Sequence, residues 1–174
     1  VYIDSKEKRI VFPVYEDGDC IFYNGRSILK WVPQGFRWKK SEVEQNAYPL
    51  WNLENCKKEC WLFEGIFDGI FWPDKACAYF GAIVTQELID KIKAKNFERV
   101  VFFGQNPNVD KASRLNRIKI ADRLKDNKLN TAIFNWHDIK EKDLNEAIVK
   151  NTIQVSKIEE RIVPWDDSAR LLKE

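Results

Sequence analysis

Two hydrophobic patterns follow one another along the chain. Up to about residue 48, short runs rich in aromatic and β-branched residues alternate with polar turns, as in RIVFPVY, EDGD and CIFYNGRSIL. The Asp17-Gly18 dipeptide between two such runs is typical of a β-hairpin. The pattern therefore predicts a small β-rich subdomain over residues 1–53.

Beyond residue 53, short apolar runs alternate with segments of helical periodicity. The runs predict buried strands at 60–63, 76–80, 100–103 and 131–134. Thr85 is expected to cap a helix with one apolar face, made of Leu88, Ile89 and Ile92. A further helix is expected over 110–127, and its apolar positions are Leu115, Ile118, Ala121 and Leu124.

This alternation predicts an α/β fold with a mainly parallel four-stranded sheet flanked by helices, preceded by the β-rich subdomain. We expect the α/β domain to occupy residues 54–150 and the segment 151–174 to form an appended helix or a linker. Ligands of such sheets bind at the carboxyl ends of the strands, so chemistry is expected there.

Composition narrows the class of protein. The chain has 174 residues, 44% of them hydrophobic, and no apolar run approaches the ~20 residues that span a bilayer. We expect a soluble cytoplasmic protein with no membrane partner. No signal peptide is recognised at the start. The absence of Met and a start that is already strand-like suggest a fragment of a longer chain. The net charge is only +2, so binding of nucleic acid would have to rely on local clusters of basic residues.

One segment has such a cluster. Residues 26–40 contain no acid, and they combine cations with aromatic side chains: Arg26, Lys30, Trp31, Phe36, Arg37, Trp38, Lys39 and Lys40. The cations can contact phosphates and the aromatic rings can stack on unpaired bases. The alternative is that the aromatic residues fill a small β core. A weaker basic pattern occurs in the expected helix 110–127, at Lys111, Arg114, Arg117 and Lys119.

The cysteines argue against a structural zinc site. Cys56 and Cys60 are the one close pair, and His137 is the one histidine, to which we assign no role. Cys20 and Cys77 lie in apolar stretches and are expected to be buried, reduced thiols.

Two acids mark the end of the first strand of the α/β region. Glu64 follows this strand, Gly65 allows a tight turn, and Asp68 lies one helical turn further on. The two carboxylates can face one metal-phosphate site, although acids at this spacing are equally common on solvated helix ends.

The chain here resembles the Toprim domain of bacterial-type and phage DNA primases. Their Glu-Gly-x-x-Asp motif is matched by Glu64, Gly65 and Asp68, and two further motifs are matched by the segments 81–85 (GAIVT) and 142–146 (KDLNE). Upstream, the resemblance includes Phe12-Pro13, Asp17-Gly18, Gly25-Arg26 and the basic segment 30–40. It implies roles for Glu64 and Asp68 in catalysis, and for both with Asp143 in metal binding.

One family motif is degenerate. Where the family has Asp-x-Asp-x-x-Gly, this chain has Gly104 and Asn106 in place of the acids, and the downstream Asp110 is equally well explained as a helix cap. We therefore expect Mg²⁺ or Mn²⁺ to bind weakly, or only together with a triphosphate. On the sequence alone, restoring Asp at positions 104 and 106 should raise the affinity for metal.

The resemblance implies DNA replication in a bacterial or phage-infected cell. The first hypothesis is a primase that makes RNA primers on single-stranded DNA from nucleoside triphosphates, with a replicative helicase as a further partner. The alternative is a catalytically inactive Toprim-like domain that binds DNA or a replication partner. A topoisomerase or nuclease of the wider group is a weaker third reading, since no strand-passage domain is present.

Overall fold

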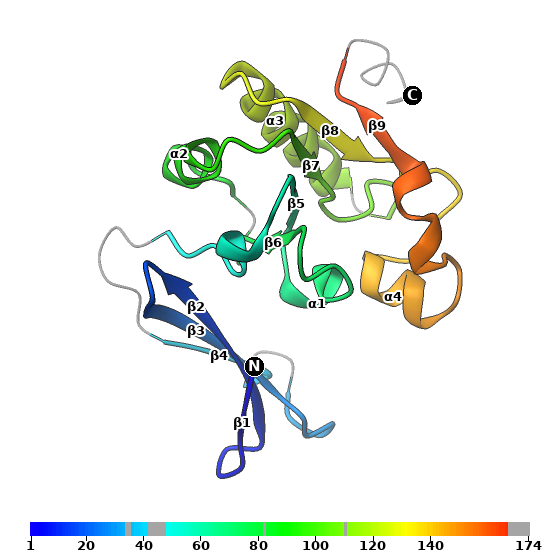
Figure 1. The fold of residues 1–174 in the computed structure, drawn as a ribbon. Coiled ribbons are helices and arrows are strands. Elements are labelled where there is room, and N and C mark those ends of the chain that lie inside the picture. The colour runs from blue at the N-terminus through cyan, green and yellow to red at the C-terminus, as the bar shows by residue number, and fades with distance from the viewer. Residues whose placement is uncertain (34–35, 42–47, 82, 110, 167–174) are drawn as a thin grey trace.

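Two β-sheets organise the chain, as the ribbon of a computed structural model shows (Figure 1). The structure describes residues 1–33, 36–41, 48–81, 83–109 and 111–166, and within them the side chains at positions 38, 39, 111 and 112 are not described. No described helix has the length and apolarity needed to cross a membrane.

The N-terminal sheet is antiparallel and has the order β1-β2-β3-β4. Its strands are β1 (Tyr2–Asp4), β2 (Arg9–Glu16), β3 (Asp19–Ser27) and β4 (Trp38–Lys40). The β2–β3 turn consists of Asp17 and Gly18, which both have positive φ angles, 52° and 92°. This is the conformation that a two-residue hairpin turn requires, so the predicted hairpin is confirmed.

The second sheet has the order β6-β5-β7-β8-β9. Its strands are β5 (Glu59–Phe63), β6 (Ala76–Ala78), β7 (Arg99–Phe102), β8 (Thr131–Phe134) and β9 (Ile162–Pro164). The four predicted strands are confirmed and are parallel to one another. The fifth, β9, pairs antiparallel with β8, so the expectation of a helix or a linker after residue 150 is corrected.

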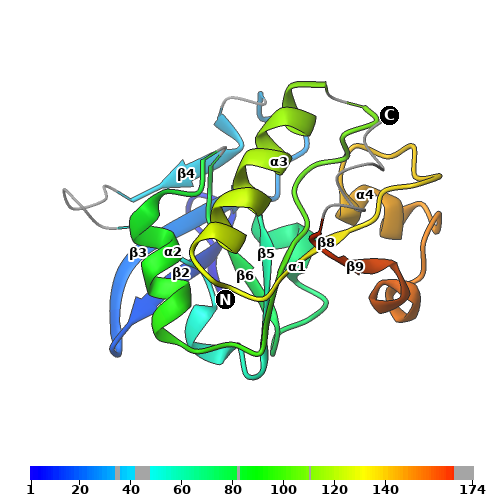
Figure 2. The ribbon, with the colours of Figure 1, turned by 90° about the horizontal axis from the view of Figure 1, so that it is seen from above.

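Helices cover both faces of this sheet. Alternate β5 residues point to opposite sides: Cys60 and Leu62 pack against α2 (Gln86–Ala94) and α3 (Lys111–Asp126), which lie side by side in Figure 2. Trp61 and Phe63 face α4 (Leu144–Val149) and the 3₁₀ turns η3 (Val155–Lys157) and η4 (Glu159–Arg161). The short α1 (Ile66–Gly69) and η2 (Leu53–Asn55) complete the described elements.

The structure confirms the expected cap of α2 and corrects two expectations, on the buried face of α3 and on Cys20. The Thr85 side chain accepts a hydrogen bond from the Leu88 N–H at 3.4 Å, as expected of the cap. Leu115 is 64% exposed, and Ile120 is the buried residue of α3 that sequence periodicity missed. Cys20 is exposed and not buried, because it lies near the solvated start of β3.

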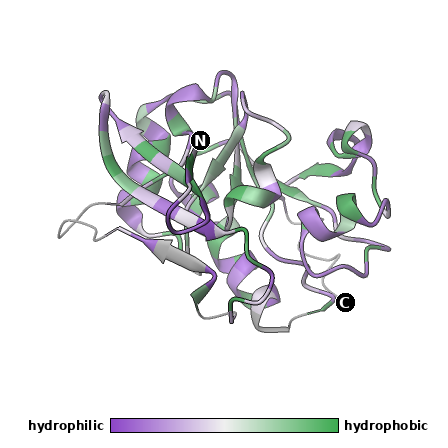
Figure 3. Cartoon of the chain, turned by 90° about the horizontal axis from the view of Figure 1, so that it is seen from below, coloured by the Kyte–Doolittle hydropathy of each residue, from purple (hydrophilic) through white to green (hydrophobic). Residues whose placement is uncertain are grey.

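The two sheets meet through a small apolar junction. Phe12 of β2 packs with Ile66 of α1 and Ala78 of β6, and the rings of Phe22 and Phe80 lie 5.2 Å apart. Hydrophobic residues are concentrated along the strands in the interior, whereas helix surfaces and loops are largely hydrophilic (Figure 3). This junction holds the N-terminal sheet beside the β5–β6 edge of the second sheet.

Candidate nucleic-acid interface and acidic site

The acidic site forms where β5, α1 and α4 meet. Glu64 follows β5 directly, Gly65 precedes the first turn of α1, and Asp68 lies within this turn. The Asp68 Oδ1 atom accepts a hydrogen bond from the backbone N–H of Asn145 at 3.2 Å. This bond brings the start of α4 against α1, although the two segments are far apart in the sequence.

Asp143 is the third acid of this site. Its side chain caps α4, accepting a hydrogen bond from the Glu146 N–H at 2.8 Å. Burial, followed by the negative charge of Asp143, raises the pKa of Asp68 to about 7, while the N–H groups of Asn145 and Leu144 oppose the shift. Asp68 is therefore partly protonated at neutral pH.

The sequence did not single out two of the neighbours of these acids, Gln105 and Tyr79. Burial raises the pKa of Glu64, while a hydrogen bond from Gln105 and the positive charge of Lys142 lower it. Burial and the charges of Glu64 and Asp68 raise the pKa of the Tyr79 hydroxyl. Tyr79 and Gln105 each follow a parallel strand closely, so the rule that sites form at the carboxyl ends of strands could have indicated them.

The degenerate motif has a structural role. Asn106 is fully buried, and its amide group donates to the carbonyl oxygens of Ile139 and Glu141, both at 2.8 Å. Its Oδ1 atom accepts the N–H of Asn108 at 2.9 Å, and its backbone N–H donates to the Lys142 carbonyl at 3.0 Å. Asn106 thus ties the loop after β7 to the loop after β8.

The donor set does not fit a divalent cation. Asn106 turns its NH₂ group toward carbonyls, and its oxygen is already bonded to a backbone N–H. Asp143 and Asp68 each accept backbone N–H groups. Within the described ranges, no group of three or more His, Cys, Asp or Glu residues converges on a position that could hold a metal ion. Hard cations need several converging anionic oxygens, so we derive no metal-dependent step.

The basic and aromatic side chains of residues 26–40 lie on the N-terminal sheet and its β3–β4 connection. Trp31 is 77% exposed and Phe36 71% exposed, and Lys30 and Lys40 are also exposed. These two aromatic residues are therefore not core residues of the small sheet. Burial, followed by the positive charge of Arg37, lowers the pKa of Arg26, which shows that two guanidinium groups lie close together.

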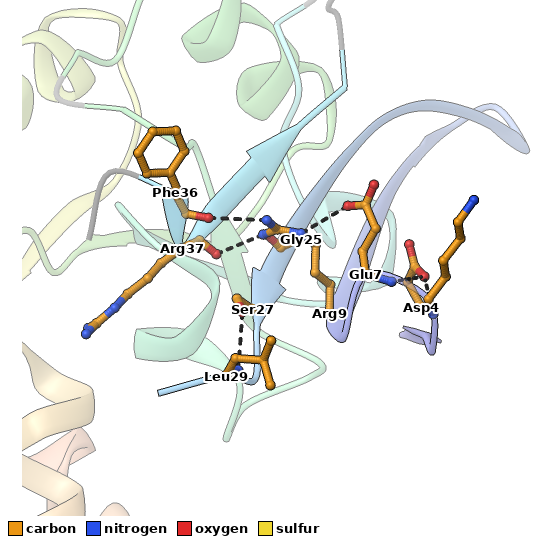
Figure 4. A network of polar contacts seen from close by, with 9 residues as sticks. Asp4, Glu7, Arg9, Gly25, Ser27, Leu29, Phe36 and Arg37 are labelled. Carbon is orange, nitrogen blue, oxygen red and sulfur yellow. Dashed lines mark hydrogen bonds and ion pairs between the residues drawn. The ribbon is translucent and has the colours of Figure 1, made fainter. Parts of the chain in front are cut away.

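Arg9 fixes the conformation of this connection. It donates hydrogen bonds to the carbonyl oxygens of Gly25, Phe36 and Arg37 and pairs with Glu7 at 3.1 Å (Figure 4). The chain at Phe36 and Arg37 is thereby held against β3, and the ring of Phe36 points away from Arg9. Sequence analysis missed Arg9, whose role depends on pairing across strands that are distant in the sequence.

A short chain of hydrogen bonds connects the basic segment to the acidic site. The Lys40 Nζ atom donates to the Phe80 carbonyl at 3.4 Å, and the Phe80 N–H donates to the Glu64 carbonyl at 3.1 Å. The basic strand β4 therefore lies beside the β5–β6 edge that carries Glu64.

The remaining candidate site residues differ in their exposure to solvent. Arg114 and Lys119 of α3 are exposed, whereas Arg117 is partly buried. His137 is exposed and lies 2.7 Å from Asp138. Asp110 and the side chains of Trp38, Lys39 and Lys111 lie outside the described residues.

Comparison with known proteins identifies the fold. No family model and no curated protein sequence matches the chain. Among solved structures, the catalytic core of the E. coli primase superposes with a TM-score of 0.70 at 18% identity, covering 97% of this chain and 56% of that chain. A DNA primase domain from Pseudomonas aeruginosa gives a TM-score of 0.66 at 16% identity, with 94% and 56% covered.

A third neighbour was solved with nucleic acid. The DnaG primase catalytic domain bound to single-stranded DNA gives a TM-score of 0.69 at 16% identity, covering 90% of this chain and 52% of that chain. The chain thus spans about half the length of these neighbours, and it has the fold of DNA primase catalytic cores.

Proposed function

We propose that this chain is a primase-type domain that binds single-stranded DNA along residues 26–40, and that primer synthesis is not its own activity. Trp31, Phe36 and the neighbouring cations provide the binding face, and the strand continues toward the edge of the sheet at Glu64. The proposal is the second of the three functional readings of the sequence, with DNA as the partner.

The exposure of Trp31 and Phe36 is the observation that carries the proposal. Exposed aromatic rings that lie beside cations in one segment are typical of a surface that binds a partner. Here two such rings, Trp31 and Phe36, lie in a segment that also carries Lys30, Arg37 and Lys40. Bases stacked on aromatic rings contribute about 1–3 kcal/mol each, and cations beside them neutralise backbone phosphates.

The acidic site supports a binding role over catalysis. Asn106 serves as a tie between loops, and Asp68 and Asp143 accept backbone N–H groups. Glu64 and Asp68 as catalytic residues, nucleoside triphosphates as substrates and a helicase as partner remain predictions from the resemblance. The neighbour bound to single-stranded DNA supports the choice of nucleic acid.

The test is a fluorescence anisotropy titration of a labelled oligothymidylate at several salt concentrations, with EDTA present. We expect micromolar or tighter binding that weakens steeply with salt. Lys30→Gln should weaken binding severalfold and make the slope of log K against log salt shallower by ~0.7, the value for one contact with a single-strand phosphate. Trp31→Ala should weaken binding about fivefold or more with an unchanged slope, because stacking releases no counterions.

Matched controls separate these effects from general loss of charge or of aromatic residues. Lys125→Gln removes an exposed lysine of α3, and Tyr2→Ala removes an aromatic side chain that is 60% exposed on β1. Both should bind like the unmodified chain. Equal affinities for Trp31→Ala, Lys30→Gln and both controls would refute the proposed face.

A further inference from the structure

Arg117 of α3 crosses the carboxyl ends of two parallel strands. Its Nη2 atom donates a hydrogen bond to the carbonyl of Phe134, the last residue of β8. Its Cδ atom lies 3.6 Å from the position that a Cβ atom on Gly104 would occupy, just beyond β7. The guanidinium group is therefore at the edge of the sheet where ligands of parallel α/β folds bind.

No carboxylate among the described residues compensates the positive charge of Arg117. None of the described acids forms an ion pair with it, and burial alone lowers its pKa, to about 10. Its Nε atom is sealed from solvent and has no hydrogen-bond partner, although the side chain as a whole is only partly buried. A guanidinium group without an anion in such surroundings costs free energy that an anionic ligand would offset.

Position 104 supplies no carboxylate beside Arg117. The resembled motif has an Asp at this position, whereas here the position of a Cβ on Gly104 lies 3.1 Å from the Phe102 ring and 3.6 Å from the Arg117 Cδ atom. The resemblance thus implies a negative charge at the place where this chain has the positive charge of Arg117. An arginine fork matches the oxygens of a phosphate group and repels a metal ion.

We propose that Arg117, beside Gly104 at the carboxyl ends of β7 and β8, binds a phosphate group directly, so that this corner is an anion site that works without a divalent cation. The phosphate belongs either to a nucleotide polyphosphate or to a nucleic-acid backbone. The inference rests on Arg117 and its surroundings and does not depend on the binding face at residues 26–40.

The first experiment measures binding of inorganic pyrophosphate to the full chain by calorimetry, in EDTA and at constant ionic strength. The unmodified chain should bind, and Arg117→Met, which keeps the aliphatic packing beside Gly104, should bind at least tenfold more weakly. Arg114→Met, an exposed arginine of the same helix, is the matched control and should bind normally. An unchanged affinity in Arg117→Met, or no binding by the unmodified chain, would overturn the proposal.

A second pair of variants leaves Arg117 in place. Gly104→Asp supplies an internal carboxylate, and Gly104→Asn supplies the same shape without the charge. Both meet the same constraints, a φ of 58° and a contact of 3.1 Å between the added Cβ and the Phe102 ring. The affinity of Gly104→Asp for pyrophosphate should be at least tenfold lower than that of Gly104→Asn. Equal affinities in the two variants would contradict the anion site even if Arg117→Met failed to fold.

Parallel titrations with tripolyphosphate and with oligothymidylate identify the source of the phosphate. If Arg117→Met weakens the binding of tripolyphosphate alone, the site takes a nucleotide. If it weakens the binding of the oligonucleotide as well, the site takes a backbone phosphate. Both outcomes support the proposal, and no effect on either ligand refutes it. Because Trp31→Ala and Lys30→Gln test the face at residues 26–40 separately, failure of one proposal is distinguishable from failure of the other.

Discussion

Asp68 shows how strongly its surroundings set the chemistry of a single side chain here. Burial and the adjacent charge of Asp143 favour its protonated form, with a pKa of about 7, whereas the same side chain in an unfolded chain has a pKa of about 4. The folded protein therefore holds a proton that the unfolded chain releases over the intervening pH range. Across this range the free energy of unfolding must fall as pH rises.

The variant Asp68→Asn tests this linkage. Asparagine keeps an Oδ1 acceptor for the Asn145 N–H but carries no charge at any pH. Near pH 4 the two proteins should have similar stability, because the unfolded chain also begins to hold the proton there. At pH 8 the variant should be more stable by at most about 4 kcal/mol, the full value of the pKa difference.

Urea denaturation of both proteins at pH 4.5 and pH 8 provides the measurement. The quantity of interest is the difference between the two proteins, since groups that do not interact with Asp68 titrate equally in both. A difference that stays constant between the two pH values would mean that the pKa of Asp68 is not raised.

At the scale of elements, the loops after β7 and β8 are joined by hydrogen bonds from Asn106. From the sequence, Asp at position 106 was expected to improve a metal site. The hydrogen bonds of Asn106 argue against this expectation. A carboxylate there would face the carbonyl oxygens of Ile139 and Glu141, which the asparagine NH₂ group now satisfies. One buried and one partly buried acceptor would lose their donors and oppose a negative charge.

We therefore expect Asn106→Asp to lower the free energy of unfolding by about 2–4 kcal/mol at pH 7. The control Asn151→Asp makes the same change at an exposed position and should cost less than about 0.5 kcal/mol. Thermal and urea denaturation measure both. A loss of stability in Asn106→Asp no larger than in the control would show that the tie contributes little.

The elements also show what the sequence could predict. The strands 60–63, 100–103 and 131–134 were predictable because buried parallel strands are continuous apolar runs. The strand β9 was not, because its three residues pair only through contact with the distant β8. Gly104 and Asn106 were recognised as a degenerate motif, but the partners of Asn106 and the position of Arg117 depend on tertiary contacts that no local pattern encodes.

At the scale of the whole molecule, the junction of the two sheets places the face at residues 26–40 beside the edge that carries Glu64. Phe12 and Phe22 of the N-terminal sheet pack against Ala78 and Phe80, and Lys40 reaches the Phe80 carbonyl. A single strand bound at Trp31 and Phe36 would therefore extend toward the carboxyl ends of β5 and β6. The position of bound DNA is the central claim of this account.

Photo-crosslinking to an oligonucleotide that contains 5-bromodeoxyuridine, followed by mass spectrometry of the crosslinked peptides, tests this claim most directly. Trp31 and Phe36 should dominate the crosslinks, because stacked aromatic rings lie against the reactive bases. An excess of unlabelled oligothymidylate should suppress these crosslinks. Crosslinks confined to other parts of the chain, such as Tyr2 on β1 or Trp165 after β9, would contradict the account.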